Sequence, residues 1–102
     1  MSASVFEVVA EPSRREILDL LIAGARPVGE LAQETGLSQP NTSRHLRILR
    51  EAGLVERHAD GQRRLYAIRK EGFVDLALRL APYVRLWQQG LGALEGHLER
   101  ME

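Results

Sequence analysis

Apolar and polar positions at the start of the chain predict two helices separated by a polar break. Residues Ala3 to Val9 form a short apolar run, and we expect a short helix there that packs on another surface. The next helix opens at Pro12 or Ser13, because Glu16 follows Ser13 at the spacing of a capping box. Its strongly apolar residues indicate a largely buried helix, which ends before an expected loop at residues 25–27.

The pattern then predicts two helices joined by a tight turn. Val28 to Thr35 forms the first helix, and Gly36 supplies the backbone turn that ends it. Leu37 is expected to be buried in the turn. Ser38 is a good N-cap for the next helix, which runs from about Gln39 to Ala52. This arrangement is typical of a helix-turn-helix.

The second helix of the pair has two chemically different faces. The core face has apolar or small residues at spacings of four, three and three: Thr42, Leu46, Leu49 and Ala52. The remaining surface is polar and basic: Gln39, Asn41, Ser43, Arg44, Arg47 and Arg50. Such side chains can make paired hydrogen bonds to base edges in the major groove of DNA. Because helix-turn-helix patterns are loose, a polar face that only meets solvent remains the alternative at this point.

Between residues 54 and 69 the pattern changes to that of a β-hairpin. Two strand-like runs flank Ala59-Asp60-Gly61-Gln62, and Asp-Gly is a strong hairpin signal. Alternation along the strands predicts Arg57 and Arg64 on the outside. The residues expected toward the core are Val55, Leu65 and Ala67. We call the helix from about Gln39 to Ala52 the reading helix. A basic hairpin directly after such a helix is typical of a wing that contacts the DNA backbone or minor groove, and an ordinary surface hairpin is the alternative.

The last third of the chain returns to helical spacing and carries an apolar seam. Apolar residues three or four positions apart run from Phe73 to Leu98, and Pro82 is expected to separate a short helix from a long final one. A small domain cannot easily cover such a seam, so we expect a homodimer rather than a helix folded back on its own core. The expected interface residues are Val5, Phe6, Val9, Leu80, Val84, Trp87, Leu91, Leu94 and Leu98.

The length of 102 residues predicts a single, mainly α-helical domain with a small β-hairpin. Residues 1–10 are its N-terminal dimerisation helix, residues 12–70 its core with the wing at about 54–69, and residues 71–102 its C-terminal dimerisation helices. The absence of cysteine excludes disulfides and thiolate chemistry. No run is long and apolar enough for a membrane span, and no secretion signal is evident, so we expect a cytoplasmic protein.

The formal net charge is zero, but the charges are unevenly distributed. Residues 1–37 hold three basic and six acidic residues, a net −3, and residues 71–102 hold three and five, a net −2. Residues 38–70 hold eight basic and three acidic residues, a net +5. The positive charge is therefore concentrated on the expected reading helix and wing, as a phosphate-binding face requires.

Three motifs, AEPSRREILDLL, VGELAQETGLSQPNTSRHLRILREAGLV and HADGQRRLYAI, resemble the ArsR-type winged-helix repressors of bacteria. The resemblance covers about residues 6–70, and the tail LAPYVRLWQQGLGALEGHL is similar to the metal-independent branch. It implies a winged helix-turn-helix that is dimeric through its first and last helices. It also implies operator contacts by Ser38, Gln39, Asn41, Thr42, Ser43, Arg44 and His45. To these we add the basic residues Arg47, Arg57, Arg63 and Arg64, of which those in the wing contact phosphates.

The chain departs from metal-sensing relatives, which carry Cys pairs or His and Asp ligands. The run from Arg26 to Leu31 has no cysteine. The last helices offer few possible ligands, of which only one is a histidine; they are Asp75, Glu95, His97 and Glu99. His97 and Glu99 are two residues apart and project to different sides of a helix. We therefore expect neither a metal site nor a cofactor.

The sequence disfavours an enzyme and favours a regulator. Ser43 and His45 are two apart on a helix, so they cannot form a nucleophile–base pair. We interpret His45 as a donor to DNA, with helix packing as the alternative. We expect a dimeric repressor on an inverted-repeat operator, released by an unknown non-metal signal, a small molecule or a partner protein. The rival hypothesis is a winged helix that binds only another protein, against which the cluster of arginines speaks.

Overall fold

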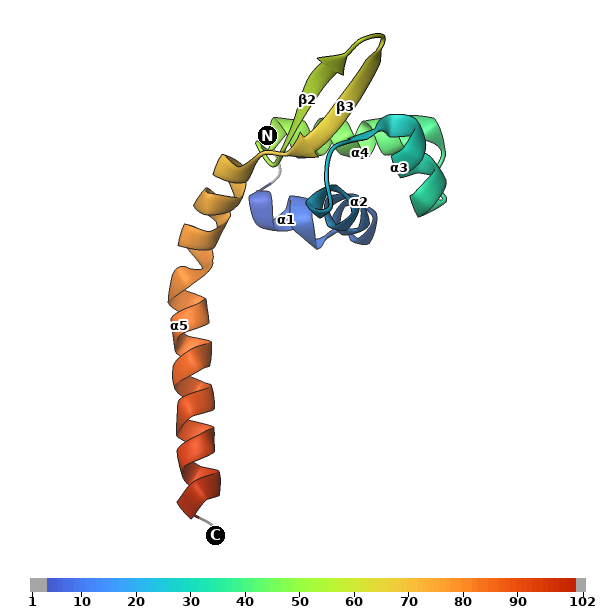
Figure 1. Ribbon diagram of the computed structural model, residues 1–102. Coiled ribbons are helices and arrows are strands. Elements are labelled where there is room, and N and C mark those ends of the chain that lie inside the picture. The colour runs from blue at the N-terminus through green and yellow to red at the C-terminus, as the bar shows by residue number, and fades with distance from the viewer. Residues whose placement is uncertain (1–3, 101–102) are drawn as a thin grey trace.

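The computed structural model describes residues 4–100, with side chains described up to Leu91 (Figure 1). Five helices and three strands follow one another along that part of the chain. In order they are α1 (Val5–Ala10), α2 (Pro12–Ile22), β1 (Arg26–Pro27), α3 (Val28–Thr35), α4 (Gln39–Glu51), β2 (Val55–Asp60), β3 (Arg63–Ile68) and α5 (Lys70–Arg100). The predicted winged helix-turn-helix is thereby confirmed.

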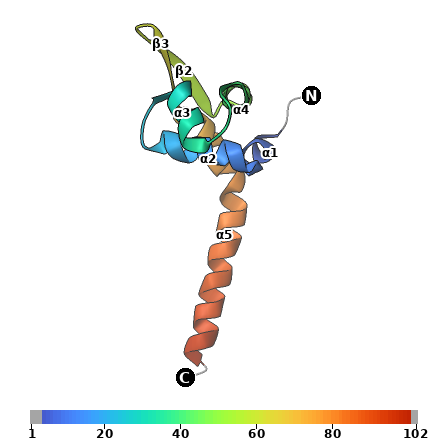
Figure 2. The same ribbon diagram turned by 90° about the vertical axis from the view of Figure 1, so that its right-hand side faces the viewer.

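The molecule consists of a head and a long projecting helix. Helices α1 to α4 pack together, the β2–β3 hairpin projects beyond α4, and α5 leaves the head in the opposite direction (Figures 1 and 2). The resulting shape measures 63 × 29 × 24 Å. No helix in the described residues is long and apolar enough to cross a membrane.

Helix α2 begins earlier than a capping box at Ser13 and Glu16 would place it. Glu11 is the N-cap, and its carboxylate accepts a hydrogen bond of 2.8 Å from the backbone N–H of Arg14. Pro12 therefore occupies the first turn, where its missing N–H costs little. The predicted capping box is wrong because Ser13 already lies inside the helix.

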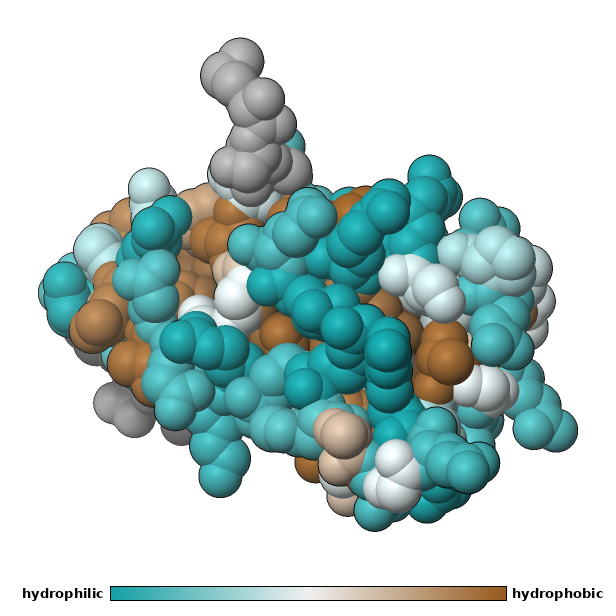
Figure 3. All heavy atoms as spheres, turned by 90° about the horizontal axis from the view of Figure 1, so that it is seen from above, coloured by the Kyte–Doolittle hydropathy of each residue, from teal (hydrophilic) through white to brown (hydrophobic). Residues whose placement is uncertain are grey.

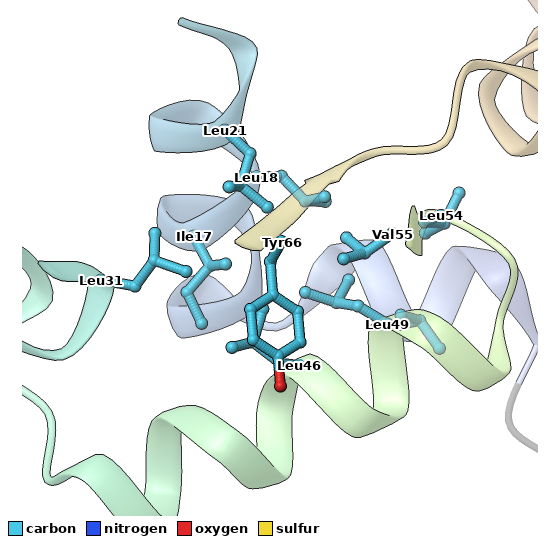
Figure 4. Close-up of a cluster of buried hydrophobic side chains, with 10 residues drawn as sticks. Ile17, Leu18, Leu21, Leu31, Leu46, Leu49, Leu54, Val55 and Tyr66 are labelled. Atoms are coloured by element: carbon cyan, nitrogen blue, oxygen red, sulfur yellow. The ribbon is translucent and has the colours of Figure 1, made fainter. Parts of the chain in front are cut away.

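The core lies between α2, α3, α4 and the base of the hairpin (Figure 4). Its fully buried aliphatic side chains are Ile17, Leu31, Leu46, Leu49 and Leu54, together with Val8 of α1. Tyr66 of β3 points from the hairpin toward α4 and is only 8% exposed. The predicted core positions Leu65 and Ala67 are only partly buried, because the intervening Tyr66 occupies the inner face of β3.

The sheet has a third strand that the sequence pattern does not predict. Its order is β1-β3-β2, and all neighbours are antiparallel. Arg26 and Pro27, expected in a loop, pair with Tyr66 and Leu65. The hairpin turn is tighter than expected, since Asp60 pairs with Arg63 and leaves a turn of two residues.

Helix α5 is continuous, so the predicted break at Pro82 is wrong. A proline removes one backbone hydrogen bond and can kink a helix, but the helix can continue through it because the neighbouring backbone hydrogen bonds remain. After its first turns, in which Phe73 and Leu76 lie against the head, α5 is exposed up to Leu91 except at the half-buried Ala81. It does not fold back on its own core (Figure 1).

Candidate nucleic-acid interface

The turn before α4 fixes how this helix is presented. Gly36 adopts a left-handed conformation with φ of 76°, which glycine reaches without strain. The Ser38 hydroxyl accepts a hydrogen bond of 3.2 Å from the backbone N–H of Asn41. The Thr42 hydroxyl donates to the Ser38 carbonyl at 2.9 Å. The start of α4 is therefore held by the side chains that the sequence places there, while Leu37 is half-buried rather than fully buried.

The outer face of α4 presents most of the predicted DNA-contacting residues to solvent. The exposed ones, including the capping residue before the helix, are Ser38, Gln39, Asn41, Ser43, Arg44 and Arg47. Thr42 is 0% and His45 is 7% exposed, so these two predicted contacts do not lie on that face. Thr42 occupies the core face, as its helical spacing predicts. For His45 the structure fits the alternative of helix packing.

Five arginines line a groove of about 480 Å³ between α4 and the hairpin. Three come from α4 and two from the hairpin: Arg44, Arg47, Arg50, Arg57 and Arg64. None of them forms an ion pair with the side chains that the structure describes. Seen from above, hydrophilic side chains cover the middle of this surface, and apolar ones gather on the side from which α5 descends (Figure 3). These arginines therefore make the electrostatic potential of the groove positive, beside the exposed face of α4.

Strand register explains why both hairpin arginines face this groove. Arg57 is paired with Tyr66, and Arg64 lies two residues before Tyr66 on the same strand, so all three lie on one face of the ribbon. Val55 shares that face, which corrects the prediction that Arg57 lies opposite it. Arg57 and Arg64 are both exposed, and the hairpin that carries them projects beyond α4 (Figure 1).

Arg50 also faces the groove, although it is not among the predicted contacts. It follows Arg44 and Arg47 at steps of three, and that spacing is the signal that could have included it. The predicted contact Arg63 lies elsewhere, at the exposed tip of the hairpin. There its guanidinium is 3.3 Å from the Asp60 carboxylate, so its charge is partly compensated.

Behind α4, His45 belongs to a small polar cluster. Its Nδ1 lies 3.4 Å from Nη1 of Arg14 and 4.0 Å from a carboxylate oxygen of Glu11. Burial lowers the pKa of His45 below the ordinary value of 6.5, the Glu11 carboxylate partly opposes this, and the charges of Arg14 and Arg44 lower the pKa further. Burial by itself would raise the pKa of Glu11, but backbone hydrogen bonds at Arg14 and Ser13 bring that pKa below 4.5.

Among the predicted dimer residues whose side chains the structure describes, those on α5 form an exposed apolar strip, and α1 adds one exposed residue. Phe6, Leu80, Val84, Trp87 and Leu91 are all exposed, whereas Val5 and Val9 are partly buried against the core. Leu94 and Leu98 lie outside the described side chains, as do His97, Glu95 and Glu99. In the described part of the chain, no three His, Asp or Glu residues are grouped so that they could hold a metal ion.

Comparison with known proteins connects this geometry to bacterial regulators. A family model described as "Bacterial regulatory protein, arsR family" matches residues 11–57. The transcriptional repressor SdpR of Bacillus subtilis is 38% identical over 65 residues, which cover 64% of this chain and 72% of that protein. The arsenical resistance operon repressor of Staphylococcus xylosus is 34% identical over 73 residues, which cover 72% of this chain and 69% of that protein.

Solved structures are also similar to this chain in both sequence and shape, and one of them is informative about assembly. It is the homodimeric winged helix-turn-helix DNA-binding domain of a possible ArsR-family transcriptional regulator from Mycobacterium bovis. Its TM-score is 0.65 at 33% sequence identity, and the match covers 79% of this chain and 75% of that one.

Proposed function

Because the chain belongs to the ArsR family of bacterial regulatory proteins, we propose that two copies of it bind an inverted-repeat operator through α4 and the wing. The chain is a winged helix-turn-helix DNA-binding regulator of transcription. The observation that supports this mode of binding best is the groove lined by five arginines beside the exposed face of α4. Occupancy of a promoter is enough to block transcription, and repression needs no chemical step.

The two ends of α4 have different roles in this proposal. Residues near its start read bases in the major groove, where Arg, Asn and Gln can form paired hydrogen bonds: Gln39, Asn41, Ser43 and Arg44. The arginines farther along the groove bind phosphates of the flanking strand: Arg47, Arg50, Arg57 and Arg64. Arg63 contributes less, because Asp60 partly compensates its charge.

The second copy associates through the exposed strip on α5 together with α1. The Mycobacterium bovis relative is homodimeric, which supports this arrangement. A two-fold dimer places its reading helices in successive major grooves about 34 Å apart, which accounts for the inverted repeat. A small molecule or a partner protein that changes the angle between the two heads would release the operator.

A mobility-shift assay with the DNA upstream of the protein's own gene tests the proposal. We expect the wild type to bind that DNA and to lose affinity steeply as salt rises. Arg44→Ala is expected to weaken binding and relax base preference at one position in each half-site, at a cost of about 1–3 kcal/mol. Arg79→Ala is the matched control, because Arg79 lies on α5 and pairs with Asp75 at 3.3 Å.

Two outcomes contradict the proposal in different ways. If the wild type leaves every duplex unbound at low ionic strength, the chain does not act by binding an operator, and a role in protein binding takes its place. If Arg44→Ala weakens binding equally on all sequences, Arg44 contacts phosphate and does not read a base.

A further inference from the structure

The side chain of Arg14 links three helices behind the reading face. It lies in the first turn of α2, and its Nε donates a hydrogen bond of 2.8 Å to the carbonyl oxygen of Val8 in α1. Its Nη1 lies 3.4 Å from Nδ1 of His45 in α4. Glu11 completes the cluster, since its carboxylate accepts from the backbone N–H of Arg14 at 2.8 Å.

The chemistry of the two side chains assigns the proton on the histidine. Because a guanidinium carries only donors, a hydrogen bond between the two groups requires Nδ1 of His45 as the acceptor, which is the neutral ring with its proton on Nε2. Arginine suits this place because its planar fork can donate in two directions at once. A lysine ammonium, as a single compact charge, cannot span the carbonyl of Val8 and the ring of His45 in the same way.

We propose that Arg14 is a positioning residue, which acts through the ring of His45 to hold α4 in its DNA-reading orientation relative to α1. The inference rests on the proposed function of α4 as the reading helix. His45 is one turn after Asn41 and next to Arg44, so the rotation of α4 about its axis sets the direction of all three side chains. When Arg14 fixes the buried ring of His45, it therefore also fixes the directions of the exposed side chains Asn41 and Arg44.

Through Val8, the Arg14 side chain connects α4 to the proposed dimer contact. Val8 is buried in α1, the helix whose exposed Phe6 belongs to the proposed dimer contact. A shift of α1 on association with a second copy therefore reaches α4 through the guanidinium of Arg14, beside the apolar packing of Val8 against α4. Arg14 in this role strengthens operator binding without touching DNA.

Two substitutions of neighbouring arginines test this role. Arg14→Met removes the link, and Arg15→Met removes the same charge from the exposed side of the same helix. We expect Arg14→Met to bind the operator about tenfold more weakly than Arg15→Met, as when a hydrogen bond to a charged group is lost. Affinity for an unrelated duplex, and the slope of affinity with salt, should be the same for both variants.

Equal operator affinity of the two variants overturns the proposal. A flatter salt slope for Arg14→Met alone also overturns it, because Arg14 would then be a phosphate contact. If even the wild type binds no duplex, the proposed function of α4 fails instead, so the two failures are distinguishable.

A second variant decides the question if Arg14→Met does not fold. His45→Gln keeps an acceptor for Arg14 but cannot be protonated. In the wild type, acid conditions place a proton on the ring beside Arg14 and Arg44, with Glu11 as the opposing charge, and remove the acceptor. Since the pKa of His45 in the folded protein lies below 6.5, we expect operator affinity of the wild type to fall as the pH is lowered through that pKa, and that of His45→Gln to fall less. Identical pH profiles would show that the ring does not position α4.

Discussion

The carbonyl oxygen of Gly53 lies so close to Gly72 that a side chain at Gly72 would overlap it. Gly53 follows the reading helix, and Gly72 lies in the first turn of α5. Arg69 closes the same joint, since its backbone N–H donates to the carbonyl of Leu54 at 2.9 Å and its Nη1 donates to the carbonyl of Gly53 at 3.3 Å. The direction in which α5 leaves the head is therefore set by contact between backbones.

Gly72→Ala is expected to strain this joint. The atoms nearest to an added Cβ are backbone atoms of Gly53 and Leu54, which cannot move aside as a flexible side chain can. Overpacking of this kind costs about 1–3 kcal/mol, and we expect the free energy of unfolding in urea to fall by that amount. Operator binding should weaken as well, because a displaced α5 changes the spacing of the two heads.

Gly29→Ala is the control for that substitution. Gly29 is an exposed residue in α3, and nothing lies within 4 Å of an added Cβ there. Such a change at an unstrained position stabilises a protein by about 0.4–1 kcal/mol. Wild-type stability and operator affinity in Gly72→Ala would contradict a role of the joint in orienting α5.

Arg64 and Arg63 are adjacent on the hairpin but should differ in their effect on DNA binding. Arg64 faces the groove and has no ion-pair partner among the described side chains, whereas Arg63 pairs with Asp60. We expect Arg64→Ala to reduce the slope of log affinity against log salt by about one, as for one lost phosphate contact. Arg63→Ala should change the slope less. Equal slopes for Arg64→Ala and the wild type would remove the hairpin from the DNA interface.

The boundaries around the turn between α3 and α4 could be predicted because their signals are local. Ser38 and Gly36 mark the turn before α4, and the structure gives α3 the predicted bounds Val28–Thr35. The strand β1 could not be predicted, since its two residues have no pattern of their own. Its partner Tyr66 lies far along the chain, and only the folded sheet brings them together.

It is harder to predict from the sequence which face of a helix or strand is buried. Alternation separates Tyr66 from Leu65 but does not say which of the two points inward. For His45 a signal was available, because it lies three residues after Thr42 and directly before Leu46, both on the core face. Its polarity favoured a DNA contact, but the ring is accommodated inside by the side chain of Arg14.

The buried His45 should make folding stability depend on pH. Burial lowers the pKa of His45 in the folded protein below 6.5, so the unfolded chain takes up this proton first as the pH falls. Stability contributed by the neutral ring is thus fully present above about pH 6.5 and declines as the pH falls from there toward the folded pKa. Glu11, whose pKa is lowered from 4.5, loses its own contribution only at more acidic pH.

Urea unfolding between about pH 7.5 and about pH 5.5 measures this dependence. We expect His45→Gln to show a flatter dependence than the wild type over this range. His58→Gln is the matched control, because His58 is exposed on the hairpin, where its Nε2 lies 3.2 Å from Glu56. A dependence that persists in His45→Gln and vanishes in His58→Gln would place the responsible proton on the wing.

Trp87 and Leu86 are neighbours on α5 and are almost equally exposed, but only Trp87 belongs to the proposed dimer contact. Comparing them therefore distinguishes a dimer contact from an exposed apolar residue outside it. They are 65% and 68% exposed in the single chain, so truncating either should cost the isolated fold little. Only Trp87 shares a seam with Leu80, Val84 and Leu91, at steps of four, three and four, while Leu86 points about 100° away.

Trp87→Ala should therefore weaken association by at least about 100-fold, since loss of a buried Trp costs about 3–5 kcal/mol. Leu86→Ala should leave association nearly unchanged. Sedimentation equilibrium over a range of concentrations measures both variants against the wild type. If Leu86→Ala dissociates and Trp87→Ala does not, the second copy binds the other face of α5. The two reading helices would then face different directions from those that an operator with inverted half-sites requires.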